Sequence, residues 1–371
     1  MAKAFGIITF ARSNVWVEGL QSYRPIGAFS FMGRYRCIDF PISNMTNSGI
    51  DQIQVYVKSH PRSLVEHLGT GRHYNLNSKR GKLHILFSDN RGDHDFYNTD
   101  IAAFMQNLEH IENKKEEYVI ISSECMVFTQ DYKKLLDTHI ESGADITLLY
   151  HSVDNAKDAY LSCNILNLNK QKGVDSIESN KGNAKNRNIF MNTYVMKTAL
   201  FIELIKQAQK ISSVYSLADI VNLSCADLDV RGVAHRGYFG AITDFKSYYT
   251  ANQELLDYKT AASLLSSSWP IHTRTNDSCP TQYFDTAKVS SSLIANGCLI
   301  EGTVENSIIG RGCHIKKGAV IKNSIVLPDV IIGTDVHLEN IVVDKHASVI
   351  RAKELIAEPE NPEYVKRNDR L

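Results

Sequence analysis

The loop that follows the first apolar run of the chain stands where many α/β proteins bind phosphate. Residues 4–8 (AFGII) predict a buried strand, and backbone N–H groups in the turn after such a strand can cradle a phosphate group. Glycine permits the unusual backbone angles and the close approach that this chemistry needs, yet the first glycine after the strand is Gly19. The loop positions are instead Ala11, Arg12, Ser13, Asn14, Val15 and Trp16. The loop therefore lacks what phosphate binding requires.

Basic side chains near this loop are the other candidates for anion binding. Arg12, Arg24 and Arg34 lie close to it in the sequence and could bind a sugar phosphate or another anion through charge-assisted hydrogen bonds. A second basic stretch predicts a solvated loop, with anion binding as its alternative; it contains Lys79, Arg80 and Lys82.

The seven cysteines are widely scattered and include no C-x-x-C pair. Neither a disulfide framework nor a zinc site is predicted, which fits a reducing cytoplasm. Cys125 has no neighbour in the sequence that would lower the pKa of its thiol. A position in the core is therefore favoured for Cys125 over a role as nucleophile or redox sensor.

Composition excludes several classes of function. The chain has 371 residues, enough for two domains, and its 41 Lys and Arg balance its 41 Asp and Glu. No net charge would draw it to nucleic acid or to anionic lipid, so neither is predicted as a partner. No segment approaches the roughly 18 apolar residues that cross a membrane. The apolar start lacks a small-residue cleavage site, which favours a first strand over a signal peptide.

From the start to about residue 255, strand-like runs alternate with helical patterns. Strands are predicted at 52–58, 118–122 and 145–151. Helices are predicted at 102–117, 131–143 and 248–265. The polar stretch 169–188 predicts a hairpin or an exposed loop. The alternation predicts a Rossmann-type, mostly parallel sheet over residues 1–255, with ligands beyond the carboxyl ends of its strands, followed by a linker over 256–285.

A different pattern, with aliphatic residues six positions apart, runs through the C-terminal part. It comprises Ile294, Ile300, Ile309, Ile315, Ile321, Ile332 and Leu338. This period predicts a parallel β-helix of hexapeptide repeats over residues 286–371. The small residues Cys298 and Cys313 follow the same spacing and are predicted to lie inside the coil. Such coils commonly contribute surfaces on which subunits assemble.

The order of these two domains is that of the sugar-nucleotide pyrophosphorylases, in which a nucleotidyltransferase-like domain precedes a left-handed β-helix. GRYRCIDFPISNMTNSGI (residues 33–50) closely resembles the stretch GGKYRIIDFPLSNCINSGI of bacterial ADP-glucose pyrophosphorylases, which make the glucosyl donor for glycogen. Later landmarks also match: MQNL (105–108), EYVII (117–121), QDY (130–132) and WPIHT (269–273). The resemblance spans nearly the whole chain.

The resemblance also identifies positions that have lost their chemistry. The family's phosphate loop, GGRGTRL, falls on residues 11–17, which contain no glycine. The family holds Mg²⁺ with two aspartates, which neutralises charge on the phosphates, and these positions are Cys125 and Ala241 here. Glu124 and Asp244 are the alternative ligands, although the loop, the lysines and both aspartates would all need to be compensated together.

Three further positions lie where the family contacts its substrates. The lysine near the phosphates or the activator corresponds to Ile26, the lysine that meets the sugar phosphate aligns with Ser179, and the lysine of DFGKD aligns with Ala218. The pattern GTADA beside the nucleotide becomes TDIAA at residues 99–103. Scaffold positions thus match the family, whereas ligand positions do not.

This combination of matching scaffold positions and changed ligand positions resembles the D-type glycogen biosynthesis subunits (GlgD), which are catalytically silent members of the family. The resemblance implies a non-catalytic regulatory subunit of glucose-1-phosphate adenylyltransferase that binds no cofactor itself, so that Mg²⁺ is needed only in the catalytic partner. It also implies assembly with a catalytic ADP-glucose pyrophosphorylase subunit as a heterotetramer, or a homo-oligomer of this chain, in the cytoplasm. Two alternatives are a divergent but active sugar-phosphate nucleotidyltransferase, which would release pyrophosphate on its own, and an independent sugar-phosphate sensor.

Overall fold

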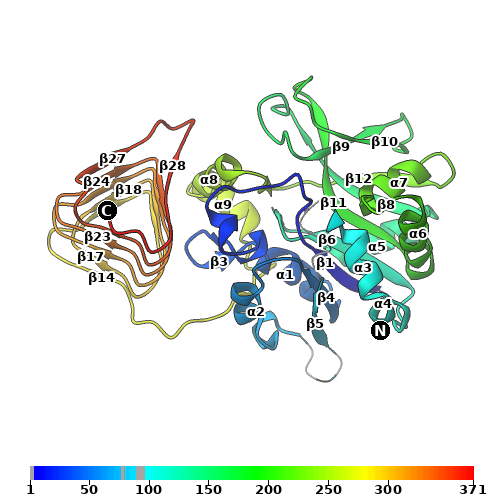
Figure 1. The fold of residues 1–371 in the computed structure, drawn as a ribbon, viewed down its shortest axis with the longest axis horizontal. Helices are drawn as coiled ribbons and strands as arrows, with labels where there is room; N and C mark the ends of the chain where they lie inside the picture. Colours follow the sequence, from blue (N-terminus) through cyan, green and yellow to red (C-terminus); the bar gives the residue numbers. More distant parts are fainter. Residues whose placement is uncertain (1–3, 77–78, 80, 89–96) are drawn as a thin grey trace.

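The chain forms an N-terminal α/β domain followed by a C-terminal coil of short parallel strands (Figure 1). The computed structural model describes residues 4–76, 79, 81–88 and 97–371, so Arg80 of the basic stretch lies outside the described residues. Helices α8 (Phe245–Glu254) and α9 (Tyr258–Leu264) lie between the sheet and the coil. The predicted fold class, an α/β domain and then a parallel β-helix, is confirmed.

A nine-stranded mixed sheet forms the centre of the α/β domain. β1 (Ala4–Thr9) pairs in parallel with β4 (Gln52–Val57) and with β6 (Tyr118–Ser123). Its side chains alternate between two apolar cores, with Ile8 in one and Phe5 in the other, because both faces of the sheet are covered. The longest strand, β11 (Arg187–Lys197), is antiparallel to β6. The others are β5 (Lys82–Phe87), β8 (Ile146–Val153), β9 (Asn164–Leu168), β10 (Val174–Ser179) and β12 (Val230–Ala234).

The helices follow the predicted pattern with two breaks, and the helix predicted at 248–265 is divided into α8 and α9. The helix predicted at 102–117 is two helices, α3 (Asp100–Gln106) and α4 (Leu108–Glu112). Asn107 separates them because its side-chain amide donates to the Ala103 carbonyl and competes with the helix backbone. The remaining helices are α1 (Asp39–Asn47), α2 (Arg62–Leu68), α5 (Tyr132–Ser142), α6 (Thr198–Ile211) and α7 (Leu217–Ser224). No helix in the described part of the chain is long and apolar enough to span a membrane.

Fifteen short strands form the coil, as three parallel sheets of five strands each. The first sheet contains β14 (Gln282–Tyr283), β17 (Leu299–Ile300), β20 (His314–Ile315), β23 (Ile331–Ile332) and β26 (Ser348–Val349). The second contains β15 (Lys288–Ser290), β18 (Thr303–Glu305), β21 (Val320–Lys322), β24 (His337–Glu339) and β27 (Glu354–Ile356). The third contains β16 (Leu293–Ile294), β19 (Ile308–Ile309), β22 (Ile325–Val326), β25 (Ile341–Val343) and β28 (Glu363–Val365).

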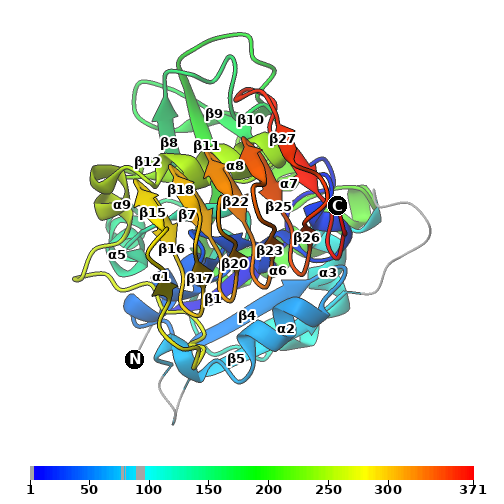
Figure 2. The same ribbon diagram turned by 90° about the vertical axis from the view of Figure 1, so that its left-hand side faces the viewer.

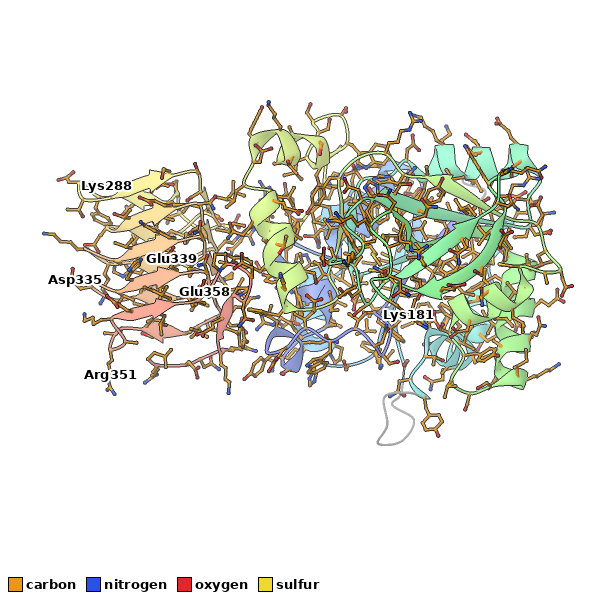
Figure 3. All side chains as sticks on the ribbon, turned by 90° about the horizontal axis from the view of Figure 1, so that it is seen from above. Lys181, Lys288, Asp335, Glu339, Arg351 and Glu358 are labelled. Carbon is orange, nitrogen blue, oxygen red and sulfur yellow. The ribbon has the colours of Figure 1, made fainter. Side chains whose placement is uncertain are left out.

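Residues of the predicted six-residue pattern stack in register inside the coil. Ile300 pairs with Ile315, and Ile315 pairs with Ile332, so that each rung places an aliphatic side chain above the last. Cys298 and Cys313 are buried in this core, as predicted. The coil begins at Gln282, inside the segment predicted as linker, because the first rung carries the exposed Tyr283 rather than a buried aliphatic residue. In Figure 3, Lys288 and Arg351 mark the two ends of the stack.

Polar ladders hold one corner of the coil. Asn306, Asn323 and Asn340 all adopt positive φ there, and the Asn306 side chain donates to that of Asn323 over 2.7 Å. The hydroxyl of Ser307 accepts from the Ser324 backbone N–H at 3.0 Å, and Ser324 repeats this contact to the next rung. These side chains satisfy backbone groups that the tight corner would otherwise leave unpaired.

The coil is joined to the α/β domain by a buried ion pair and by shared apolar packing. The Arg24 guanidinium lies 2.8 and 2.5 Å from the two carboxylate oxygens of Asp344, and Tyr364 donates to the same carboxylate over 2.7 Å. Ile308 and Val342 of the third sheet belong to the core of the α/β domain. Figure 2 shows the coil strands stacked across that domain. The two domains therefore form one packed unit.

The two ends of the coil differ. At the C-terminal end, Ser348 donates its backbone N–H to Asp369 and Ile350 donates to Leu371, so the final residues cover the edge of β26. At the N-terminal end, β14, β15 and β16 each pair on one side within the described residues. Tyr283, Phe284 and Val289 are exposed there. At the C-terminal end β26 is thus covered while β27 and β28 pair on one side; at the N-terminal end, called the open end, all three strands pair on one side within the described residues.

Asp344→Asn should destabilise the chain by about 3–5 kcal/mol, because it leaves the Arg24 charge buried without a carboxylate. Urea unfolding followed by circular dichroism measures this change. Glu305→Gln is the matched control in the coil, since the Glu305–Lys322 pair has side chains 45% and 41% exposed and should contribute at most about 1 kcal/mol. Equal losses for the two variants would contradict a structural role for the buried pair.

Candidate functional site

The loop after β1 is compact and does not open toward a ligand. The Val15 N–H donates to the Arg12 carbonyl over 3.0 Å, which closes a turn, and the Val15 side chain is buried in the domain core. Trp16 is 57% exposed. The Asn14 side chain donates to the Ser162 carbonyl over 3.3 Å, and Ser13 is exposed. One buried carboxyl group lies next to the loop.

Glu124 is that group. It follows the carboxyl end of β6, is only 3% exposed, and its backbone N–H donates to Thr9 at the end of β1. Its Oε2 atom lies against Gly27, where an added Cβ atom would overlap it. Burial raises the pKa of Glu124 to about 8, although the nearby backbone N–H groups of Gly27 and Ala11 act in the opposite direction. A buried carboxyl group that stays protonated at neutral pH thus lies beside the degenerate loop.

The two positions predicted to have lost metal ligands lie side by side. β7 (Met126–Phe128) and β13 (Phe239–Ala241) pair in antiparallel fashion, with Ala241 opposite Met126, and the Ile242 N–H donates to the Cys125 carbonyl over 2.8 Å. Cys125 and Ala241 are both buried. Burial raises the pKa of the Cys125 thiol to about 12, so it stays protonated at neutral pH. The place where two carboxylates were expected therefore offers a neutral thiol and a methyl group.

The alternative ligands do not rebuild a Mg²⁺ site. Asp244 caps α8, where its side chain accepts the Ser247 N–H over 2.7 Å. The carboxyl group of Glu124 lies against Gly27. Magnesium needs oxygen ligands in nearly octahedral geometry, and this donor set does not fit it. Among the described residues no cluster of three His, Cys, Asp or Glu side chains could hold a metal ion.

The predicted substrate positions are dispersed. Ile26 and Ala218 are buried apolar residues, and Ser179 is exposed at the end of β10, an edge strand of the sheet. Beside the loop, the Arg12 guanidinium lies 3.7 Å from Asp219 near the start of α7. Asp100 accepts the N–H groups of Ile101 and Leu217, which ties the starts of α3 and α7 together. Contacts between side chains and backbone of the chain itself therefore occupy the region beside the loop.

The three arginines expected to bind an anion do not form one site. Arg12 pairs with Asp219, and Arg24 is 2% exposed and paired with Asp344, so the expectation that Arg24 faces a ligand is wrong. This pairing could not be predicted from local sequence, because the partner of Arg24 lies 320 residues away. Arg34 is exposed and lines a separate cavity at the boundary with the coil.

That cavity, the basic pocket, has a volume of about 500 Å³, and five of the residues that line it are Arg or Lys. They are Arg34 and Arg36 from β3 (Tyr35–Arg36) and the turn before it, Arg274 from the linker, and Arg311 and Lys345 from the coil. Asp277 is its acidic lining residue. Burial, with Arg36 and Arg24 nearby, lowers the pKa of Lys345 from 10.5 to about 7. The pocket thus concentrates positive charge that an anion would neutralise.

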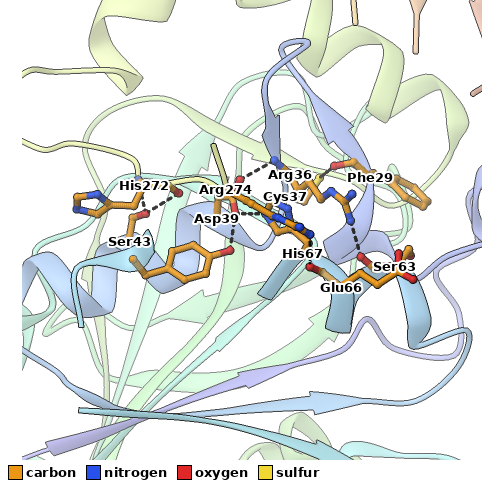
Figure 4. Close-up of polar contacts among 11 residues, drawn as sticks. Phe29, Arg36, Cys37, Asp39, Ser43, Ser63, Glu66, His67, His272 and Arg274 are labelled. Atoms are coloured by element: carbon orange, nitrogen blue, oxygen red, sulfur yellow. Dashed lines mark hydrogen bonds and ion pairs between the residues drawn. The ribbon is translucent and has the colours of Figure 1, made fainter. Parts of the chain in front are cut away.

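A buried network around Asp39 holds part of this pocket in place (Figure 4). Asp39 accepts from the Arg36 backbone N–H at 2.8 Å and bonds to His67 at 2.6 Å, while Arg36 donates to the Ser63 carbonyl over 2.6 Å. Burial opposes ionisation of Asp39, but the charge and hydrogen bond of His67 lower its pKa overall. Sequence reasoning missed the pocket because its cations come from four segments; only Arg34 was named.

Glu124→Gln should flatten the dependence of stability on pH. Between the ordinary pKa of 4.5 and the folded value of about 8, the folded chain keeps a proton that the unfolded chain releases, so wild-type stability falls as pH rises, by at most about 1.4 kcal/mol per unit. Urea unfolding at pH 5, 6, 7 and 8 measures the difference between the two proteins. Asp100, whose pKa burial raises to about 6, titrates in both and cancels. Parallel curves would contradict the buried position of this carboxyl group.

Both halves of the chain match known protein families. The Nucleotidyl transferase family matches residues 20–258, and the family GlmU-like, C-terminal hexapeptide matches residues 280–363. The second match begins two residues before the first strand of the coil, Gln282–Tyr283.

Individual relatives agree with these matches. The glycogen biosynthesis protein GlgD of Geobacillus stearothermophilus is 32% identical over 86% of this chain and 83% of its own length. The glucose-1-phosphate adenylyltransferase of Clostridium perfringens (strain 13 / Type A) is 31% identical over 81% of this chain and 77% of its own. GlgD of Bacillus subtilis (strain 168) is 27% identical over 98% of this chain and 95% of its own. The chain therefore belongs to the nucleotidyl transferase family, in the group that contains glucose-1-phosphate adenylyltransferases and GlgD proteins.

Proposed function

We propose that this chain is a non-catalytic regulatory subunit of glucose-1-phosphate adenylyltransferase, which acts in ADP-glucose synthesis for glycogen. One observation carries the proposal: the adjacent residues at the family's metal positions, Cys125 and Ala241, supply no oxygen ligand. A bound cation neutralises the negative charge of reacting phosphates. Loss of this stabilisation typically raises the activation barrier by several kcal/mol. Mg²⁺ would then be bound only by the catalytic partner.

Association with a homologous catalytic chain is supported by what this chain retains. The open end of the coil combines strand edges that pair on one side with the exposed side chains of Tyr283, Phe284 and Val289. Edges of this kind readily pair with another chain. A companion raises the activity of its neighbour only if it binds the active conformation better than the inactive one. We infer a hetero-oligomer in which this preference changes the partner's response.

The divergent-enzyme alternative requires ligands that the described residues do not supply. Asp244 is engaged at a helix start, and Glu124 is buried against Gly27. Restoring both aspartates, as Cys125→Asp with Ala241→Asp, would still leave the loop without glycine. We therefore favour the regulatory subunit.

Co-expression with the glucose-1-phosphate adenylyltransferase of the same organism tests this proposal. The chains should elute together, with a mass that requires both chains in one assembly, and the mixed assembly should differ by about fivefold or more in turnover, apparent substrate affinity or effector response. The chain alone, given Mg²⁺, ATP and glucose 1-phosphate, should release no pyrophosphate above background. Separate elution, or unchanged kinetics in the complex, would refute the regulatory role.

Paired variants locate the contact. Tyr283→Glu with Val289→Glu introduces charge at the open end of the coil and should weaken co-elution. Leu223→Glu is the control, because Leu223 is 51% exposed on α7 and lies outside the coil. If both variants co-elute with the catalytic chain as well as wild type does, the open end is not the contact surface.

A second candidate, an independent anion sensor, is favoured by the basic pocket. Arg311 has a buried Nε without a hydrogen-bond partner among the described residues, and burial together with Arg34 lowers the pKa of its guanidinium. An anion would supply the missing acceptor and relieve the repulsion between these cations. Such binding is also compatible with a regulatory subunit that carries an effector.

Arg311→Gln should weaken binding of sulfate or glucose 1-phosphate about tenfold or more, because it removes a charged hydrogen-bond donor. Calorimetry measures the affinity, and Arg351→Gln on the exposed end of the coil is the control. Wild-type affinity for sulfate should fall as pH rises through about 7, where Lys345 loses its proton. An affinity that neither variant alters would remove the support for a sensor.

A further inference from the structure

Two adjoining cavities of the α/β domain share no lining residue with the basic pocket. The larger has a volume of about 770 Å³ and lies where the end of β8 meets the start of β11. The smaller, of about 190 Å³, lies between the segment that follows β8 and helix α8. Asn155 and Tyr160 line both cavities, so the two meet along this segment. The pair of cavities is named the polar groove.

Aromatic rings form part of the polar groove. The Tyr160 ring stacks on Phe239, with ring centroids 5.8 Å apart and planes 11° from parallel, and the Tyr160 hydroxyl donates to the Phe239 carbonyl over 3.3 Å. The His151 ring lies 5.5 Å from the same phenyl ring. Phe239 is buried, whereas Tyr160 and His151 are partly exposed. Phe239 therefore holds two rings in place at the groove.

Neutral polar side chains surround the larger cavity. Asn155, Asn186 and Asn188 line it, and each carboxamide offers two hydrogen-bond donors and an acceptor. Asn188 accepts from the Ser152 hydroxyl over 2.8 Å, while Asn155 and Asn186 are exposed. Nδ1 of His151 is buried and has no hydrogen-bond partner in the described parts of the chain. This lining suits a ligand whose own groups both donate and accept hydrogen bonds.

The smaller cavity is lined by one face of α8. Its residues Ser247, Thr250, Ala251 and Glu254 recur at spacings of three and four, so their side chains lie on the same side of the helix. Ala241 also lines this cavity, so a phosphate group there would meet a methyl group rather than a metal ligand.

Charge separates the polar groove from the basic pocket. The lining of the groove includes four carboxylates and two cations, which are Asp154, Asp158, Asp244 and Glu254 against Arg187 and Lys246. Burial lowers the pKa of His151, so its ring is neutral at pH 7 and adds no positive charge. An excess of carboxylates repels a phosphorylated ligand and leaves an uncharged one unaffected.

We propose that the polar groove binds an uncharged glucan chain, with one sugar ring against Tyr160 and hydroxyl groups on the surrounding amides, hydroxyls and carboxylates. A sugar ring has an apolar C–H face that packs on an aromatic ring, and its hydroxyl groups both donate and accept hydrogen bonds. Two adjoining cavities suit consecutive units of a chain. That these units are glucose rests on the proposed function in glycogen synthesis.

Calorimetry with maltoheptaose, an uncharged α-linked glucan, tests the proposal on this chain alone. Binding should be saturable and about tenfold or more tighter than that of maltose, which fills only part of the groove. Tyr160→Ala should weaken maltoheptaose binding about tenfold or more, whereas Tyr160→Phe keeps the ring and should stay within about threefold of wild type. Tyr258→Ala is the matched control, because Tyr258 is 84% exposed on α9 and lines neither cavity.

Absence of saturable maltoheptaose binding would overturn the proposal, as would equal affinities of Tyr160→Ala and Tyr258→Ala or equal affinities for maltose and maltoheptaose. If Tyr160→Ala does not fold, Asn155→Ala with Asn186→Ala supplies a second test, because both side chains are exposed. Maltoheptaose binding should fall about fivefold or more in this double variant, and an unchanged affinity would contradict the site. No catalytic chain enters these measurements, so glucan binding and the regulatory role can fail independently.

Discussion

The buried pair of Arg24 and Asp344 is the constraint on which both functional regions depend. It fixes the coil against the α/β domain, and this docking brings Arg311 and Lys345 of the coil over Arg36 to form the basic pocket. The same segment continues from Arg24 into the turn Ile26–Ala28, in which Gly27 lies against the Glu124 carboxyl group. A charge pair of this kind adds little net stability but fixes one arrangement, because either partner left alone in the interior would be costly.

The two regions have opposite electrostatic character. In the degenerate cleft, charge is removed or paired internally: a thiol and a methyl group replace carboxylates, and Arg12 meets Asp219. In the basic pocket, cations accumulate with few acidic neighbours, so that burial and mutual repulsion depress the pKa of Lys345. Cations thus gather at the boundary between the domains, whereas the residues at the predicted metal positions are neutral.

The sequence predicted most of the fold because its signals are local. Hexad spacing placed Ile300 and Ile315 in the coil core, and matching motifs placed Cys125 and Ala241 at positions that the structure brings together. Predictions failed where distant partners decide the outcome. Arg24 looked available only because Asp344 is remote in sequence, and the basic pocket exists only after the coil docks. Glu124 was considered as a metal ligand, since nothing local reveals that its carboxyl group is buried against Gly27.

The unequal ends of the coil limit how large an assembly can become. A coil with two open ends could add copies head to tail without limit and grow into a filament. In this chain the C-terminal residues occupy the edge of β26, so the last rung offers no continuation of that sheet. Head-to-tail pairing through that sheet is then blocked, whereas pairing between two open ends that face each other would give a closed arrangement related by a twofold axis. Residues 369–371 therefore act as a stop at the edge of β26.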